Sequence, residues 1–405
     1  MFYEVQGVEF VNKGAELMLY GIVQHFQEND NRAIVAANLE RRYRNKQGRA
    51  KVGLQYVTWV DNRLPNSGLI INGLASLLPA PVRRNLQLVL NQEIDVLLDA
   101  SGFSYTDQWG AGYAQRMAAK LSRLKAEGKK IILLPQAFGP FDDAQVRAAF
   151  ENILLNSDLV FARDRVSYDY VRQFDAAGDK LNLAPDFTNL VSGRVPDYFA
   201  QQTQDLASNK HRVCIIPNVR MLDKTEAKVR EQYLVFLENC IQCLFDLKLN
   251  PFIMVHQTGK DYEIALNLQS KFSDRAGYPT DNPLSVIAET DPLAIKGIIG
   301  QCFLVISSRF HGIVSSLSQG VPCLATGWSH KYQMLFEDYG CSQLLINPLF
   351  TPAEIKTKIE QVATEPNRTE IVNTIKTAAL EQKQLSQKMW QQVHQTIGLE
   401  TKLTE

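Results

Sequence analysis

An arginine, a histidine and a lysine occur in one short stretch at spacings that could place them around a single anion. Arg309 and His311 follow the apolar run 302–307, which has the length and β-favouring residues of a buried parallel strand. A helical pattern begins at Gly312 and stops at Gly320, so both side chains lie where a strand passes into a helix N-terminus. Free N–H groups and the positive end of the helix dipole favour an anion there.

Lys331 is predicted at the same edge of the sheet. It follows the next strand, 321–325, and opens another helix. Because parallel strands end at one edge, we expect Lys331 near Arg309 and His311, which together suit a phosphate or a carboxylate. A purely structural role for His311 competes with this interpretation.

The other predicted strands also end in polar, charged or glycine residues, and ligands of open parallel sheets bind at such ends. On this ground we predict nine substrate-binding residues: Asn12, Gly14, Gly102, Gln136, Arg163, Asn218, His256, Gln257 and Ser308.

Several of these candidates have an ordinary structural explanation, which the sequence leaves open. Arg163 could pair with Asp164 or Asp169 at a helix start, as could its neighbour Arg165. Asn12 and Gly14 could merely cap and turn into the following helix.

His256 could be a core histidine with satisfied hydrogen bonds. The chain has no Gly-x-Gly-x-x-Gly or Walker pattern, which argues against dinucleotide and P-loop sites. Neither His-x-Glu nor a carboxylate pair indicates a metal, and the Cys240-x-x-Cys243 pair lies in a helical pattern without a second pair. We therefore expect no metal and no cofactor.

The composition is that of a globular protein with room for two domains. The chain has 405 residues, of which 45% are hydrophobic and 21% charged. With 43 basic and 43 acidic residues, it lacks the charge excess of nucleic-acid or anionic-membrane surfaces. No apolar run approaches the roughly 18 residues of a membrane span, and no signal peptide is visible. Scattered cysteines favour a reducing compartment, so the cytoplasm is expected. A homo-oligomer is left open.

Apolar runs alternate with helix-period segments along the chain, which is typical of parallel α/β sheets. We predict two doubly wound, Rossmann-like domains, residues 1–195 and 205–365, with a polar linker within 192–210. A Gln- and Lys-rich helix in 366–405 has the sparse apolar positions of a docking helix. The predicted strands are 3–11, 32–38, 94–100, 130–135, 159–162, 181–184, 212–217, 252–256, 284–288, 303–307 and 321–325.

Taken together, certain motifs resemble the polysaccharide pyruvyl transferase family from about residue 5 to 345. The specific part is Ser308-Arg-Phe-His311, then Gly320-Val-Pro322, Lys331 and Gly340. The less specific parts are Asn12-Lys-Gly-Ala-Glu16, Gly102, Phe161-Ala-Arg-Asp164 with Ser167, and Pro185-Asp186.

The resemblance implies a two-domain glycosyltransferase B-like fold with the site in the interdomain cleft and the C-terminal helix packing back across the domains. It implies transfer of the pyruvyl group of phosphoenolpyruvate onto a sugar of a polysaccharide, such as an exopolysaccharide, as a ketal. The donor would bind residues 205–365 and the carbohydrate acceptor residues 1–195. Residues 41–90, which include a basic patch at 41–51, match nothing in the family and could determine acceptor specificity.

The chemistry of phosphoenolpyruvate assigns a role to each cation. Arg309 and Arg163 would hold its carboxylate and phosphate, His311 would act as general acid or base, and Lys331 would neutralise the departing phosphate. Two alternatives remain: a nucleotide-sugar-dependent glycosyltransferase of the same fold, and a non-catalytic carbohydrate-binding protein.

Overall fold

The chain forms two compact units. The computed structural model describes residues 1–30, 32–38, 56–58, 73–204, 211–273 and 283–399, so the basic patch at 41–51 lies outside the described residues. The N-terminal unit comprises residues 1–11, 15–187 and 385–405, and the C-terminal unit comprises 12–14 and 188–384. Each unit has its own sheet, and each is described by itself.

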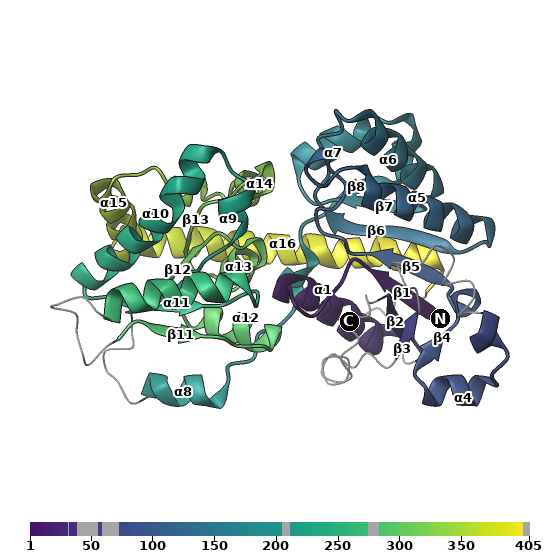
Figure 1. Cartoon of the computed structure of the whole chain (residues 1–405), viewed down its shortest axis with the longest axis horizontal. Helices are drawn as coiled ribbons and strands as arrows, with labels where there is room; N and C mark the ends of the chain where they lie inside the picture. Colours follow the sequence, from purple (N-terminus) through teal and green to yellow (C-terminus); the bar gives the residue numbers. More distant parts are fainter. Residues whose placement is uncertain (31, 39–55, 59–72, 205–210, 274–282, 400–405) are drawn as a thin grey trace. The chain divides into compact units, whose positions relative to one another are not determined.

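The N-terminal unit is built on an eight-stranded parallel sheet of order β4-β3-β2-β1-β5-β6-β7-β8 (Figure 1). The central strands are apolar and buried, because helices cover parallel sheets on both faces. The strands are β1 (Phe2–Gln6), β2 (Ile34–Asn38), β3 (Tyr56–Thr58), β4 (Leu88–Val89), β5 (Val96–Asp99), β6 (Lys130–Gln136), β7 (Leu159–Ala162) and β8 (Leu181–Leu183).

Helices α5 and α6 supply much of the hydrophobic core against β5, β6 and β7. Leu121 of α5 and Phe150 of α6 are fully buried in the same cluster as Ile131 and Val160 of the strands. Asp143 caps α6 by accepting hydrogen bonds from the N–H groups of Gln145 and Val146, which fixes where the helix begins. The helices of this unit are α1 (Lys13–Asn29), α4 (Ala80–Asn85), α5 (Ala111–Ala126), α6 (Ala144–Asn156) and α7 (Arg165–Arg172).

The C-terminal unit has a five-stranded parallel sheet of order β11-β10-β9-β12-β13. Every residue of β9, β12 and β13 is buried, so these strands are covered on both faces. The strands are β9 (Arg212–Ile216), β10 (Asn250–Met254), β11 (Ser285–Ile287), β12 (Leu304–Ser307) and β13 (Cys323–Ala325).

None of the helices in the described residues is both long and apolar enough to cross a membrane. Nine α-helices of the described chain begin between residues 188 and 384, in this unit. They are α8 (Asp197–Gln204), α9 (Arg220–Asp223), α10 (Ala227–Asp246), α11 (Lys260–Ser273), α12 (Pro292–Gly300), α13 (Phe310–Leu317), α14 (His330–Asp338), α15 (Pro352–Ala363) and α16 (Asn367–Ile397).

The predicted strands all occur, most of them within one to three residues of their predicted ends. β3 and β4 come from the stretch 41–90, where the sequence pattern was ambiguous. The predicted linker is not polar coil throughout, because α8 forms within it and the N–H of Arg194 donates to the Leu293 carbonyl oxygen. Helix α16 has 31 residues, and from Leu385 onward it belongs to the N-terminal unit.

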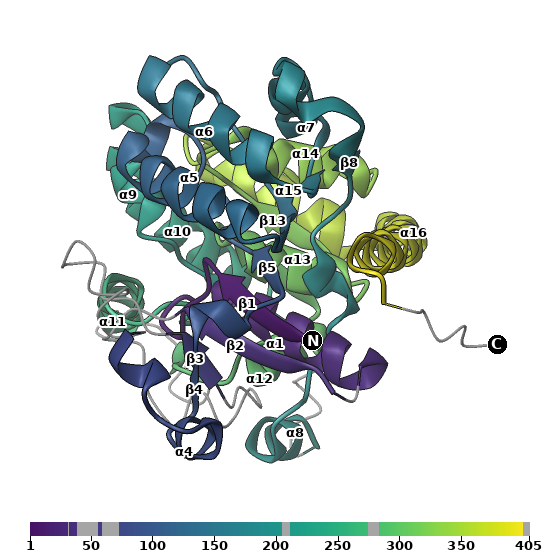
Figure 2. The same cartoon turned by 90° about the vertical axis from the view of Figure 1, so that its right-hand side faces the viewer.

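Within the N-terminal unit, α1 lies beside β1 and β2 (Figure 2) and also contacts the end of α16. The ring of His25 stacks on Trp390 at a centroid distance of 3.9 Å, and its Nε2 lies 2.9 Å from Nε2 of His394. Burial, followed by the charge of His394, lowers the pKa of His25 to about 3. Burial also lowers the pKa of His394, which Asp30 partly offsets. The contact is therefore stable when both imidazoles are neutral.

We predict that His25→Gln makes the protein less sensitive to acid. Between the folded pKa of about 3 and the unfolded value of about 6.5, the unfolded chain binds a proton at His25 that the folded chain does not. The free energy of unfolding should therefore fall as pH is lowered through this window, and fall less in the variant. Urea denaturation at about pH 7 and about pH 4.5 measures the difference, with the exposed His211→Gln as control. The prediction would be contradicted if the free energy of unfolding fell by the same amount between the two pH values in wild type and in His25→Gln.

Candidate functional site

The carboxyl ends of β9, β10 and β12 are neighbours in the C-terminal sheet, and half of the predicted site residues follow them. Arg309 is the N-cap residue of α13, with an extended backbone. Its N–H donates to Oγ of Ser307 at 3.0 Å, and the same hydroxyl donates to the Arg309 carbonyl at 3.2 Å. This local pair of hydrogen bonds turns the chain from strand to helix and fixes the direction in which Arg309 leaves it.

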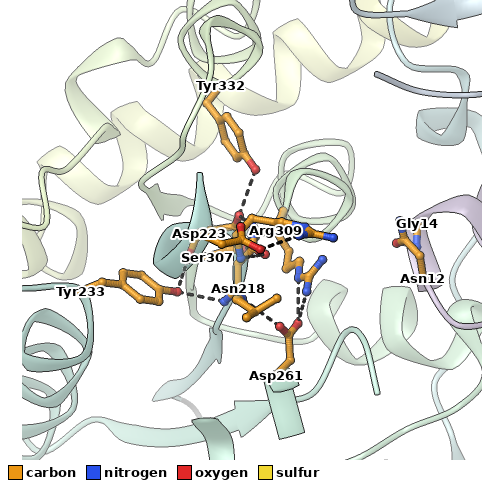
Figure 3. Close-up of polar contacts among 12 residues, drawn as sticks. Asn12, Gly14, Asn218, Asp223, Tyr233, Asp261, Ser307, Arg309 and Tyr332 are labelled. Carbon is orange, nitrogen blue, oxygen red and sulfur yellow. Dashed lines mark hydrogen bonds and ion pairs between the residues drawn. The ribbon is translucent and has the colours of Figure 1, made fainter. Parts of the chain in front are cut away.

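A buried carboxylate holds the guanidinium of Arg309 (Figure 3). Oδ2 of Asp261 accepts from Nε at 2.8 Å and lies 2.5 Å from Nη2. Oδ1 of Asp261 accepts the N–H of Val219 at 2.9 Å, and the residue is completely buried. Nη1 of Arg309 makes no hydrogen bond to any described residue. One edge of the guanidinium is thus fixed by the protein, while the other remains available to a ligand.

Two tyrosines and an asparagine bind Ser308. The Tyr233 hydroxyl lies 2.5 Å from the Ser308 hydroxyl. The carbonyl oxygen of Ser308 accepts from Nδ2 of Asn218 at 2.6 Å and from the Tyr332 hydroxyl at 3.0 Å (Figure 3). Oδ1 of Asn218 accepts the N–H of Arg220. The polar atoms of Ser308 and Asn218 therefore join the ends of β9 and β12. They fix the backbone of the residue that precedes Arg309.

His311 packs against the backbone of residues 12–14, which belong to the C-terminal unit. A Cβ added to Gly14 would lie 2.2 Å from Nδ1 of His311, so only glycine leaves room for the ring. Oδ1 of Asn12 accepts the Gly14 N–H at 3.1 Å, and Asn12 forms an antiparallel bridge with Gln257 after β10. The structural explanation for Asn12 and Gly14 is thus correct, and their turn also determines the position of His311.

His256 is 3% exposed, and its Nδ1 has no hydrogen-bond partner among the described residues. Burial, then the charges of Arg309, His311 and Lys13, lowers its pKa well below the usual value. His256 is therefore a neutral hydrogen-bonding group surrounded by basic residues. Buried polar atoms of proteins rarely lack partners, so Nδ1 is a position where a ligand could bind.

Aromatic rings surround the ammonium group of Lys331. Nζ lies 4.4 Å from the ring centroid of Trp328 and 5.5 Å from those of Phe310 and Tyr332, and the residue is 7% exposed. Cation–π attraction stabilises a charge in such a position. Lys331 thus contributes a buried positive charge beside α13.

The remaining predicted residues lie in the N-terminal unit. Nη1 of Arg163 donates to Oδ2 of Asp186 at 3.0 Å, and both side chains are buried. Arg163 is thus ion-paired, as its structural explanation expected, but with Asp186, which the sequence did not suggest; Arg165 pairs with Asp169 as expected. The part of Arg163 in donor binding stays a prediction.

Two further candidates, Gly102 and Gln136, follow β5 and end β6. Gly102 has a positive φ of 71° and its carbonyl accepts the N–H of Ala137, so it shapes the loop after β5. Gln136 is fully buried, and its Nε2 donates to the Asp99 carbonyl at 3.5 Å. Their substrate-binding roles stay predictions.

Four residues that the sequence did not single out complete the site: Lys13, Tyr233, Asp261 and Tyr332. Lys13 was visible as a charge in the turn after β1. Asp261 lies 48 residues before Arg309, in the first turn of a helix where acidic residues are common, so its sequence position gave no signal. The two tyrosines lie within helical patterns that indicate only a buried face.

The arrangement can bind an anion through Arg309, Lys13 and Lys331 and can exchange a proton at an imidazole. Within the described residues, no group of three or more His, Cys, Asp and Glu side chains is placed to hold a metal ion. The six cysteines are free and buried, and burial raises the pKa of Cys240 and Cys243. Cys240 and Cys243 therefore offer no reactive thiolate.

Comparison with known proteins identifies the family of this chain. A family model described as polysaccharide pyruvyl transferase matches residues 12–330. The amylovoran biosynthesis protein AmsJ of Erwinia amylovora is 18% identical over 264 residues, which cover 62% of this chain. The match spans 61% of the length of AmsJ, less than two thirds of that relative.

Solved structures share the fold at low sequence identity. Anabaena HepE in complex with UDP-glucose aligns with 98% of this chain and 99% of its own at a TM-score of 0.58 and 13% identity. S. aureus MnaA in a co-structure with UDP aligns with 99% of this chain and 98% of its own at a TM-score of 0.61 and 10% identity. UDP-GlcNAc 2-epimerase of Neisseria meningitidis aligns with 97% of this chain and 99% of its own at a TM-score of 0.56 and 11% identity. These likenesses, together with the two sheets, confirm the predicted glycosyltransferase B-like fold.

We predict that Asp261→Ala lowers the free energy of unfolding by about 3–5 kcal/mol, because it leaves the buried guanidinium of Arg309 without its partner. The matched variant Asp223→Ala breaks an ion pair with Arg220 of 2.6 Å between side chains that are 36% and 44% exposed. Asp223→Ala should lower the free energy of unfolding by no more than about 1 kcal/mol. Urea denaturation of both variants tests the difference, and similar small losses would show that the Asp261 pair is not structurally important.

Proposed function

Since the chain belongs to the polysaccharide pyruvyl transferase family, we propose that it transfers the pyruvyl group of phosphoenolpyruvate onto a sugar as a ketal and releases phosphate. The observation that carries the proposal is the guanidinium of Arg309, one edge of which Asp261 leaves open, together with the charges of Arg309, His311 and Lys13 that act on His256. AmsJ is an amylovoran biosynthesis protein, which supports a role in making a polysaccharide.

The donor carries a carboxylate and a phosphate, and both groups suit the available cations. Asp261 occupies Nε and Nη2 of Arg309, so a donor oxygen binds at Nη1. Lys13 and Lys331 supply further positive charge at low exposure, where an ion is weakly screened. Nδ1 of the neutral His256 can form a hydrogen bond with the same ligand.

Ketal formation balances without an oxidant or a reductant. The C3 methylene of phosphoenolpyruvate gains a proton, and one sugar hydroxyl adds to C2. The bond between C2 and the phosphate oxygen then breaks, and a second sugar hydroxyl attacks C2. Of the two hydroxyl protons released, one replaces the proton used at C3 and the other leaves with phosphate. The scheme uses no metal and no cofactor.

In this scheme His311 moves the proton, and Lys331 stabilises the phosphate that departs. The Gly14 backbone packs closely against the His311 ring and restricts its movement, because any side chain at residue 14 would clash with the ring. Such a fixed imidazole needs no reorientation when the reaction occurs, which favours catalysis.

The second candidate is a transferase that uses a nucleotide sugar. It is favoured by the solved structures of the same fold that contain UDP or UDP-glucose. The carboxyl edge of the C-terminal sheet, which offers cations to phosphoenolpyruvate, would offer the same cations to a diphosphate.

We predict that phosphoenolpyruvate stabilises the full-length protein against heat and that UDP does not. At a ligand concentration of 100 times Kd, binding to the folded state alone adds roughly 2.7 kcal/mol to the free energy of unfolding. Thermal denaturation with each ligand at equal concentration measures this effect. Stabilisation by UDP and not by phosphoenolpyruvate would favour the nucleotide-sugar transferase.

We also predict that His311→Ala lowers turnover by about 10²–10⁴-fold and leaves the fold intact, because one acid–base group contributes about that much. Phosphate release from phosphoenolpyruvate with a panel of glycan acceptors measures turnover, and circular dichroism checks the fold. His211→Ala serves as the control, since His211 is exposed and packs on Phe303. If His311→Ala kept nearly the full rate, His311 would have no part in proton transfer.

A further inference from the structure

A polar cavity of about 260 Å³ opens beside the Arg309–Asp261 pair, within the C-terminal unit. It lies between α9, which follows β9, and the segment that leads from β10 into α11. Its lining side chains include Arg220, Asp223, Gln257, Thr258, Lys260 and Asp261. Of the predicted substrate-binding residues only Gln257 lines this cavity, and Asp261, which also lines it, binds Arg309.

The charges around this cavity are balanced. Arg220 and Lys260 carry the positive charges, and Asp223 and Asp261 carry the negative ones. Arg220 is paired with Asp223 at 2.6 Å and Asp261 is paired with Arg309, while Lys260 makes no ion pair within the described part of the chain. Phosphoenolpyruvate carries several negative charges, so it prefers the basic residues around Arg309 to a cavity with a single unpaired ammonium group. The cavity therefore suits a ligand that is polar and uncharged.

The lining also offers both kinds of hydrogen-bonding group. The carboxylate of Asp223 accepts, the ammonium of Lys260 donates, and the side chains of Gln257 and Thr258 can do either, whereas Asp261 is buried and binds Val219 and Arg309. A sugar hydroxyl donates one hydrogen bond and accepts others, so a ring with several hydroxyls can satisfy such a lining. An apolar ligand would leave these groups without partners, which is costly.

The size of the cavity limits the ligand. Small-molecule pockets commonly have volumes of about 300–1,000 Å³, so a cavity of about 260 Å³ has room for one sugar ring and not for an oligosaccharide or a whole nucleotide sugar. The rest of a longer acceptor would have to extend out of the cavity.

We propose that this cavity binds one neutral sugar ring of the acceptor. The inference rests on the proposed function, since it makes the ring the receiver of the pyruvyl group. Through Asp261 the sugar would lie next to Arg309 and the donor. The acceptor would then be recognised in the C-terminal unit, whereas the sequence predicted residues 1–195 for this role.

The test measures sugar binding directly. Saturation-transfer NMR of the full-length protein uses D-glucose, D-galactose and D-mannose as probes. The double variant Asp223→Asn, Thr258→Ala removes one charged acceptor and one hydroxyl from the lining. It should weaken binding of the sugar that binds wild type by at least about tenfold, because hydrogen bonds to a charged group are worth that much or more. Glu263→Gln, an exposed residue of α11 outside the lining, should bind like wild type.

Thermal denaturation with phosphoenolpyruvate is run on the same variants. The double variant should keep the stabilisation by phosphoenolpyruvate that wild type shows. Loss of that stabilisation would show that the cavity holds the donor, and it would overturn the assignment to a sugar. The assignment also fails if none of the three sugars binds wild type, or if the double variant binds as well as wild type.

The two proposals fail separately. If wild type binds a sugar in the expected way but is not stabilised by phosphoenolpyruvate, the pyruvyl-transfer proposal is wrong and the sugar site stands. If phosphoenolpyruvate stabilises the protein and the double variant binds sugar as well as wild type does, the donor site stands and the sugar site is wrong.

Discussion

The ion pair between Arg309 and Asp261 is the interaction on which the site depends. A guanidinium that is nearly buried needs a partner, and Asp261 provides one while also accepting the N–H of Val219 after β9. One carboxylate therefore connects the strand ends of β9 and β12 to the first turn of α11. Because it occupies one edge of the guanidinium, it leaves the other edge directed to a ligand and prevents the arginine from adopting other rotamers.

The hydrogen bonds around Ser308 also hold Arg309 in position. Tyr233, Tyr332 and Asn218 come from three separate segments, and all three bind this one residue between β12 and Arg309. Their polar atoms are used within the protein, so they position the site instead of presenting groups to a ligand. A site built on such a rigid frame loses little entropy when it binds its substrate.

The C-terminal unit separates two kinds of surroundings along a single sheet edge. Basic residues gather around His256, whose pKa is lowered by burial and then by their charges, whereas the cavity lined by Asp223 and Lys260 has residues of both charges. Under the proposed function, this difference would distinguish an anionic donor from a neutral acceptor. Asp261 belongs to both surroundings, which would bring the two substrates together.

The sequence alone predicted all the strands except β3 and β4, and the parallel α/β class, because these follow from local patterns: apolar runs and helix starts. The anion-binding role that the positions of Arg309 and His311 at a strand end suggested stays a prediction. Even the 31-residue helix α16 was visible from its spacing of apolar residues. The tertiary structure decided which partner each charge has. Asp261 joins Arg309 across 48 residues, Asp186 joins Arg163, and Gly14 meets the ring of His311 almost 300 residues away. Such pairings depend on how distant strand ends meet in space, and no local pattern of residues encodes that.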